Sequence, residues 1–310
     1  MSDKHRNHSF QKFLTILLLL CLRYSVCGVS FPLDSIAFQP NRFYPMVATG
    51  GTIITGSLTG LYTLWYKDYE QSGFHTFNDN GAWLQMDKIG HTLSAYYIGE
   101  VSHTTLQWCG VKEKKAIWYG GLTGLGYLTV IEVFDGFSEE WGFSWGDMAA
   151  NAAGSGLYIG QELLWEEQRI RMKYNFIPSP YAKYRPSTLG VGFLAQSLKD
   201  YNGQAYWLST NPNSWVELDR WPKWLNLAFG YSADGMTGGD RNVFPLWEPG
   251  QSIPEFTRTR QYYLSLDLDL HGIPAKRNWF RAFRSVFGFI KVPAPALGIN
   301  SKGDWLFEIR

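Results

Sequence analysis

The chain has 310 residues, enough for one large domain or two modest ones. Charged residues make up 18% of it, below the roughly 25% of typical soluble domains, while aromatic residues reach 17%. The formal net charge of +1 leaves no basic surplus to neutralise phosphates, which excludes nucleic acid as a partner. The mean hydropathy of -0.20 excludes a protein made mostly of membrane spans.

Residues 1–27 have the pattern of a secretory signal peptide. Basic residues open the segment, a short apolar stretch from Phe13 to Leu22 follows, and a plausible cleavage site ends at Cys27. The apolar stretch is too short to span a bilayer. An uncleaved N-terminal anchor and a lipidated Cys27 stay open as alternatives. We therefore expect an exported protein of a bacterial-type cell envelope, either periplasmic or anchored to a membrane.

After an extended segment over residues 28–44, we expect a helical region over 45–178. Apolar periodicity and helix-breaking residues predict its helices at 46–68, 83–108, 115–135 and 145–174. Ser144 and Asp147 form an S-x-x-D capping box, which predicts the start of the last helix.

Glycines recur at a spacing of four residues in three of these helices. The pairs are Gly56 with Gly60, Gly120 with Gly124, and Gly156 with Gly160. This spacing lets helix backbones approach closely, and each glycine costs a helix about 1 kcal/mol relative to alanine, so close packing must offset it. The uncharged stretch 46–66 also matches the length of a bilayer crossing. The pattern predicts a Gly-rich bundle of about four helices associated with a membrane, with a soluble bundle as the alternative.

From residue 179 to 310 the pattern changes, and we expect a small β-rich region. Apolar residues occupy every second position over 225–231 and 262–270, and a further strand is expected over 305–309. Each pattern predicts a strand with one buried face. Three or four strands are too few for a transmembrane barrel, which needs about eight. The predicted fold is therefore mainly α, a helical bundle followed by a small sheet.

One amphipathic helix is expected in the β-rich region, over residues 276–290. Its aromatic face carries Trp279, Phe280, Phe283, Phe287 and Ile290, and its basic face carries Arg277, Arg281 and Arg284. A basic face opposite an aromatic one is typical of a helix that lies in a membrane interface. A surface helix docked on the domain is the alternative.

Three of the expected helices each carry a pair of polar residues in apolar, Gly-rich surroundings. The pairs are Asp87 with His91, Glu132 with Asp135, and Asp147 with Asn151. The members of a pair stand three or four residues apart and share a helix face. Because burying such groups unpaired is costly, we expect them to meet one another or a ligand. Each also has a structural explanation: a capping box for Asp147, a solvated helix end for the second pair, and a hydrogen-bonded core histidine for His91.

One histidine with several carboxylates suits Mg²⁺, Mn²⁺ or Ca²⁺ better than a structural zinc site. The candidate ligands of such a divalent cation are His91, Asp87, Glu132 and Asp147. In the catalytic hypothesis His91 is a general base oriented by Asp87, and the other carboxylates act as acids or metal ligands. The chain has no G-x-S-x-G elbow, no cysteine pair for zinc, no phosphate loop and no H-E-x-x-H motif.

These motifs together resemble a known family. They are Asp87-Lys88-x-x-His91, Glu132-x-x-Asp135, and Ser144-x-x-Asp147 with Asn151 and Gly154. They look like those of the YfiM-like family of predicted periplasmic proteins, over about residues 80–165 and more loosely in the later run LKDYNGQAYWLS. A fainter similarity extends to VanZ-like membrane proteins. The resemblance implies an envelope location and a shared polar site, and it implies no activity because the family lacks an established one.

Two classes of function remain open from the sequence. The first is an envelope protein with a structural, ligand-binding or lipid-binding role, whose partners are membrane lipids or another envelope protein. The second is a hydrolase that acts on a lipid headgroup or glycan, by general acid–base chemistry or with a divalent cation. The sequence leaves the enzymatic question undecided.

Overall fold

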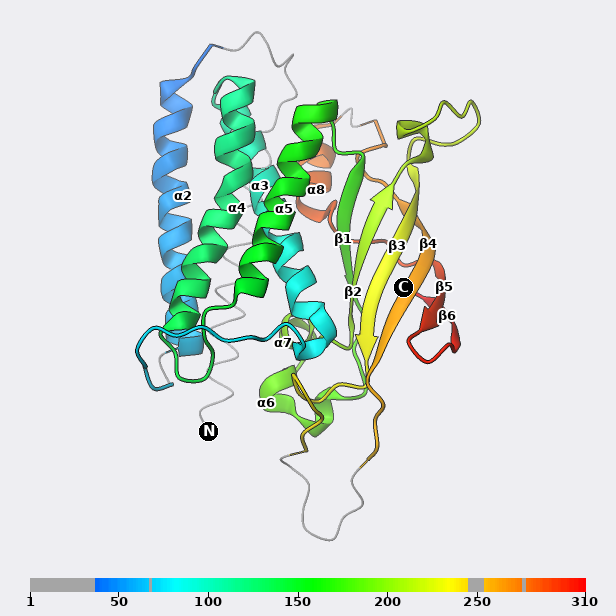
Figure 1. Ribbon diagram of the computed structural model, residues 1–310. Helices are drawn as coiled ribbons and strands as arrows, with labels where there is room; N and C mark the ends of the chain where they lie inside the picture. Colours follow the sequence, from blue (N-terminus) through cyan, green and yellow to red (C-terminus); the bar gives the residue numbers. More distant parts are fainter. Residues whose placement is uncertain (1–36, 67–68, 245–253, 275–276) are drawn as a thin grey trace. The chain divides into compact units, whose positions relative to one another are not determined.

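The computed structural model describes residues 37–310 apart from 67–68, 245–253 and 275–276 (Figure 1). The predicted signal peptide, Cys27 and most of the extended segment therefore lie outside the described residues. The chain divides into two compact units. The first takes the described residues up to Asp79, His91–Gln168 and the helix before residue 288. The second takes Asn80–Gly90, Arg169–Pro274 and Gly288–Arg310.

Long helices dominate the first unit and confirm the four helical segments expected there (Figure 1). They are α2 (Pro40–Leu61), continued by a π-helical turn η2 (Tyr62–Tyr66), α3 (Met86–Trp108), α4 (Glu113–Gly136) and α5 (Trp145–Trp165). Helix α2 begins inside the segment expected to be extended, because a proline at the first helical position has a suitable φ and lacks only a hydrogen that would be unpaired there. The same unit contains α8 (Asn278–Phe287).

Glycines hold α3, α4 and α5 close together. A Cβ added at Gly120 or Gly124 of α4 would collide with the α3 backbone at His103 or Ala95, and one at Gly154 of α5 would collide with α3 at Thr92. The close packing predicted from the Gly120–Gly124 pair is therefore confirmed. The prediction is wrong for α5, since a Cβ at position 156 or 160 would meet no atom within 4 Å.

Among the described helices, α4 is the one that passes a length and composition test for a membrane crossing. Its most apolar window is 33% buried in the structure. The uncharged stretch 46–66, whose length matches a bilayer crossing, does not pass this test. Helix α2, which contains most of that stretch, has no buried residue.

The last helix of the bundle is shorter than the sequence predicted. It ends at Trp165, and Glu166 follows with a left-handed φ of 55°. Residues 170–174, expected to be helical, belong to strand β1 (Ile170–Phe176). The reason is a period of two, since Ile170, Met172 and Tyr174 alternate with basic and polar residues.

The second unit is built on one antiparallel sheet whose strands follow chain order from β1 to β6 (Figure 1). After β1 come β2 (Gln204–Thr210), β3 (Leu225–Asp234), β4 (Thr259–Leu268), β5 (Pro295–Asn300) and β6 (Trp305–Ile309). The predicted strands over 225–231, 262–270 and 305–309 are confirmed as β3, β4 and β6, but the expected number of three or four is wrong. Short helical segments connect β1 to β2, namely η4 (Ala182–Tyr184), α6 (Pro186–Leu189) and α7 (Phe193–Lys199), and η5 (Pro212–Ser214) connects β2 to β3. The turn η3 (Ala82–Gln85) directly precedes α3.

The buried face of this sheet is the more polar one. A small core of Ala205, Trp207, Ala228, Tyr263 and Ala296 lies there. Around it the structure buries an ion pair in which Lys173 Nζ lies 2.7 Å from Asp267 Oδ2. The same oxygen accepts a hydrogen bond of 2.6 Å from Ser209 Oγ, and Lys173 Nζ also donates to the carbonyl oxygen of Leu268 at 2.9 Å. Strand-to-strand hydrogen bonds and this ion pair replace the water that the buried charges lose.

Candidate functional site

Four of the polar residues singled out in the sequence meet inside the helical unit. His91 comes from α3, Glu132 from α4, and Asp147 and Asn151 from the first two turns of α5. Helix α5 approaches α3 closely because Gly154 has no side chain, which lets the two polar segments come within contact distance. We call these four residues the polar cluster.

The His91 ring is oriented by Asn151. Its Nδ1–H donates to Asn151 Oδ1 at 3.0 Å, since an amide oxygen can only accept. A neutral ring with the proton on Nδ1 has its lone pair on Nε2. That nitrogen lies 3.8 Å from Asp147 Oδ1, too far for a hydrogen bond. The other carboxylate, Glu132, lies on the Nδ1 side of the ring, with its Oε1 at 3.8 Å.

The capping box at the start of α5 forms in part. Ser144 Oγ accepts a hydrogen bond of 3.1 Å from the backbone N–H of Asp147, as predicted, and donates one of 2.6 Å to Asp79 Oδ1. In a full capping box the side chain at position 147 would accept the N–H of Ser144. That N–H instead donates to Glu132 Oε2 at 3.2 Å. The cap therefore leaves the Asp147 carboxylate facing His91.

Burial changes the acidity of Glu132, which is only 1% exposed. Loss of hydration raises its pKa to about 8, and the negative charge of Asp147 acts in the same direction. The positive charge that His91 can carry and the N–H of Ser144 oppose the shift. At neutral pH the Glu132 carboxyl group is therefore largely protonated, while an ordinary glutamate would be ionised.

Helix α5 also brings buried polar atoms without a hydrogen-bond partner among the residues that the structure describes. They are Nδ2 of Asn151 and, one turn later, Oγ of Ser155. Asn151 is fully buried and Ser155 is 1% exposed. Unpaired buried donors cost about 1–3 kcal/mol each, so a fold retains them where another role or a bound molecule compensates.

Two of the predicted site residues have other contacts. Asp135, on α4, accepts a hydrogen bond of 2.6 Å from the hydroxyl of Tyr66. Asp87 stands one helical turn before His91 on α3, in the part of that helix that belongs to the second unit. There it accepts a hydrogen bond of 2.7 Å from the hydroxyl of Tyr201 and lies 3.4 Å from Lys88 Nζ.

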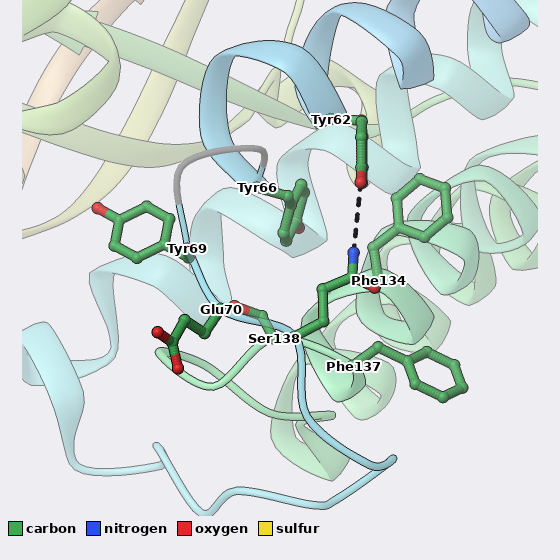
Figure 2. Close-up of a pocket in the computed structure, with 8 residues that line it drawn as sticks. Tyr62, Tyr66, Tyr69, Glu70, Phe134, Phe137 and Ser138 are labelled. Atoms are coloured by element: carbon green, nitrogen blue, oxygen red, sulfur yellow. Dashed lines mark hydrogen bonds between the residues drawn. The ribbon is translucent and has the colours of Figure 1, made fainter.

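A cavity of about 210 Å³ opens near Asp135, between η2 and the end of α4 (Figure 2). Its lining is largely aromatic, and it includes Tyr62, Tyr66, Tyr69, Phe134 and Phe137. The side-chain amide of Gln71 donates to the Tyr62 hydroxyl at 3.3 Å (Figure 2). No residue of the polar cluster lines this cavity, so the cluster and the cavity are separate features of the helical unit.

A second group of ionisable residues was missed by the sequence analysis. His103, Glu113 and Glu162 come from α3, α4 and α5, and their ligand-type atoms lie within 4.8 Å of one another. His103 is hydrogen-bonded to the Tyr158 hydroxyl at 2.6 Å and to Glu113 Oε1 at 3.1 Å. Glu113 was not assigned to a helix because the third helix was expected to begin only at residue 115, whereas α4 begins at Glu113. No short spacing in the sequence links these three residues.

The amphipathic helix predicted over 276–290 is α8, and its aromatic residues contact one another as expected for one face. Ring centroids of Phe280 and Phe283 are 6.3 Å apart, and those of Phe283 and Phe287 are 4.9 Å apart. Trp279 is 61% exposed and Phe283 is 41% exposed. The Arg281 side chain lies outside the described part of the chain, and Arg284 is half-buried.

Residues 73–160 match the model of one protein family, described as predicted periplasmic lipoproteins (DUF2279). The matched stretch holds all residues of the polar cluster. Comparisons with curated proteins and with solved structures gave no match. The family description confirms the expected location in the cell envelope, periplasmic or membrane-anchored, and it assigns no activity. The part of this chain from 73 to 160 is thus similar to a periplasmic family of unknown function.

Proposed function

We propose that this envelope protein binds a divalent cation at the polar cluster of its helical unit, and that the role of the site is binding and not turnover. The observation that carries the proposal is the gap between His91 Nε2 and Asp147 Oδ1, at 3.8 Å. Two ligands of one Mg²⁺ or Mn²⁺ lie roughly 3–4 Å apart, because each is about 2.1 Å from the ion. A cation between these two atoms would bind both of them.

The chemistry of the neighbours supports a cation. Asn151 fixes the ring so that the Nε2 lone pair faces Asp147, the arrangement in which second-shell hydrogen bonds orient metal-binding histidines. An imidazole with carboxylate oxygens suits Mg²⁺, Mn²⁺ or Ca²⁺. Glu132 lies on the other side of the ring and is not a ligand in this proposal.

Glu132 gives the proposal a distinctive consequence. The carboxyl group holds a proton near neutral pH because of its burial and the Asp147 charge. A divalent cation bound to Asp147 would neutralise that charge and lower the pKa of Glu132, so cation binding would release a proton.

The alternative function is general acid–base hydrolysis, and one observation favours it. With a pKa of about 8, Glu132 would carry the proton that a general acid needs at neutral pH, beside His91 as a base. Against it, no cluster residue lines the aromatic cavity, and a glycan or lipid headgroup needs such space next to the reacting groups. We therefore place hydrolysis second.

The test is calorimetric titration of the purified full-length chain with Mg²⁺, Mn²⁺ and Ca²⁺ in buffers of different ionisation enthalpy. We expect one site for at least one of these ions, with proton release. His91→Gln and Asp147→Asn should each weaken binding tenfold or more. Asp135→Asn is the matched control, an acidic residue on α4 that contacts Tyr66, and should leave affinity within twofold.

Glu132→Gln separates cation binding from proton release. It should keep the affinity and abolish the proton release, since residue 132 is not a ligand. The proposal fails if none of the three ions binds at millimolar concentration, or if the control weakens binding as much as the two cluster variants do.

A further inference from the structure

The outer face of the sheet in the second unit is apolar and exposed to an unusual extent. Two rows of residues run across it from strand to strand in register. One row consists of Leu208, Phe229, Leu264, Leu297 and Phe307, and the other of Tyr231, Tyr262, Ile299 and Trp305. All of them except the half-buried Tyr231 are exposed, up to 73% for Trp305 and 78% for Phe307. Contiguous apolar patches of this kind mark interaction surfaces.

Charge is nearly absent from this face. Strands β3 to β6 are fully described, and of their outward positions Arg260 alone carries a charged side chain. It stands near the start of β4, beyond Tyr262, where it donates to Gln85 Oε1 at 2.7 Å. Lys302, in the exposed turn between β5 and β6, lies just beyond Asn300 and close to Trp305 in the chain.

The inward positions have the opposite character. They include the ion pair of Lys173 and Asp267, the buried Asn226, and Arg310, whose guanidinium group donates to Ser232 Oγ at 3.2 Å. An antiparallel sheet of a water-soluble protein alternates apolar-in with polar-out. A sheet in contact with lipid alternates apolar-out with polar-in. This sheet has the second pattern.

The order of residues along the strands distinguishes lipid from a protein partner. At the end of the sheet that holds the start of β4 and the β5–β6 turn lie Arg260 and Lys302. Moving along the strands from that end, the row with Tyr231, Tyr262 and Trp305 is next, and the row of leucine and phenylalanine follows it. Tyrosine and tryptophan collect at the level of lipid headgroups, charged residues lie in water, and aliphatic residues lie in hydrocarbon. The succession from charged to aromatic to aliphatic residues is the order met on passing from water into a bilayer.

We infer that the outer face of β3 to β6 contacts the acyl chains of a lipid membrane, with the Tyr231–Tyr262–Trp305 row at the headgroups. This contact is independent of the cation site. Strand β6 pairs with β5 alone among the described strands. An unpaired strand edge is not tolerated in hydrocarbon, so the β6 edge lies at the rim of the contact.

Flotation of the full-length chain with vesicles of phosphatidylcholine tests this inference. The lipid is zwitterionic, so added charge does not change attraction to the surface. Cys27→Ser is present in every protein, so that a lipid on this residue cannot contribute. We expect the parent protein to float with the vesicles, and Leu264→Arg combined with Phe307→Arg to lower the partition coefficient at least tenfold.

Leu164→Arg is the matched control. It makes the same chemical change at a leucine that is 74% exposed on α5, and it should leave partitioning within twofold. Urea unfolding of each variant checks that the fold is retained. If the arginine pair unfolds the protein, Leu264→Ser with Phe307→Ser takes its place, with the same direction expected.

Three outcomes would overturn the inference. The parent protein could remain entirely with the aqueous fraction. The control could lose partitioning as completely as the double variant. Analytical ultracentrifugation without lipid could show that the parent protein is a dimer and the double variant a monomer. That result would assign the face to a contact with a second copy of the chain.

Discussion

The two units of this protein bury ionisable groups in opposite ways. In the sheet, Lys173 Nζ and Asp267 Oδ2 meet at 2.7 Å, and each has a further hydrogen-bond partner, while Asp267 Oδ1 is buried with no partner among the described residues. In the helical unit, His91 faces Asp147 at 3.8 Å with no direct hydrogen bond, and the amide nitrogen of Asn151 is buried with no partner among the described residues. The directly contacting ion pair stabilises the fold, whereas the 3.8 Å separation of the two side chains in the helical unit leaves room for an ion between them.

The largest effect on stability is expected from removing one partner of the Lys173–Asp267 ion pair. Lys173→Met should lower the free energy of unfolding by about 3–5 kcal/mol, because it leaves Asp267 buried without its counter-charge. Urea unfolding measures this. Lys302→Met, at an exposed turn, is the control and should change stability by less than about 0.5 kcal/mol. An equal loss of unfolding free energy in the two variants would contradict the structural role assigned to the ion pair.

The next effect concerns pH and the helical unit. The folded pKa of Glu132 is raised to about 8 from an ordinary value of 4.5, so the folded chain binds more protons than the unfolded chain between these limits. Its contribution to stability is therefore fully present below pH 4.5 and falls as pH rises toward 8. Relative to Glu132→Gln, the parent protein should lose about 3 kcal/mol between pH 5 and pH 8 in metal-free buffer, from a shift of this size.

Chemical unfolding of both proteins across this pH range, with a chelator present, measures the difference. Asp135→Asn is a suitable comparison, since it changes a carboxylate on the same helix and should retain the pH dependence. Parallel stability curves for the parent and Glu132→Gln would show that residue 132 titrates normally, and would contradict the burial argument.

A smaller effect is expected from the glycine that brings α5 to the cluster. Gly154→Ala should cost about 1–3 kcal/mol, because its methyl group would collide with the α3 backbone at Thr92. Gly156→Ala, two residues along the same helix with no atom in reach, should instead stabilise by about 0.5–1 kcal/mol through helix propensity. Thermal unfolding of the two variants compares them directly. Equal shifts would mean that α5 does not need the close approach.

Periodicity was sufficient to predict the existence of α2 to α5, because each has a long apolar pattern, but it misplaced the start of α2 and the end of α5. It failed for β1, where Arg171 and Lys173 suggested the solvated end of a helix, although Ile170 and Met172 alternate with them as in a strand. It also missed β5, which is six residues long and contains a proline and a glycine.

The cluster residues were named from spacing within helices, which the sequence shows. The contacts between helices depend on packing, which it does not. Nothing in the sequence revealed that Ser144 would donate its N–H to Glu132, twelve residues away in the chain, in place of the Asp147 carboxylate that a full capping box would use. The sequence also did not predict that the apolar face of the sheet is exposed and its polar face buried. Alternation shows that a strand has two unlike faces, but the curvature and partners of the sheet decide which face is inside.

Nitrogen NMR of the protein labelled in histidine tests the central claim most directly, because it reports the two His91 ring nitrogens separately as Mg²⁺ or Ca²⁺ is added. The account predicts that Nδ1 keeps its proton, held by Asn151, while the Nε2 signal shifts and saturates with the ion. An Nε2 signal that stays unchanged at saturating millimolar concentrations of both ions, with the rest of the spectrum intact, would contradict it.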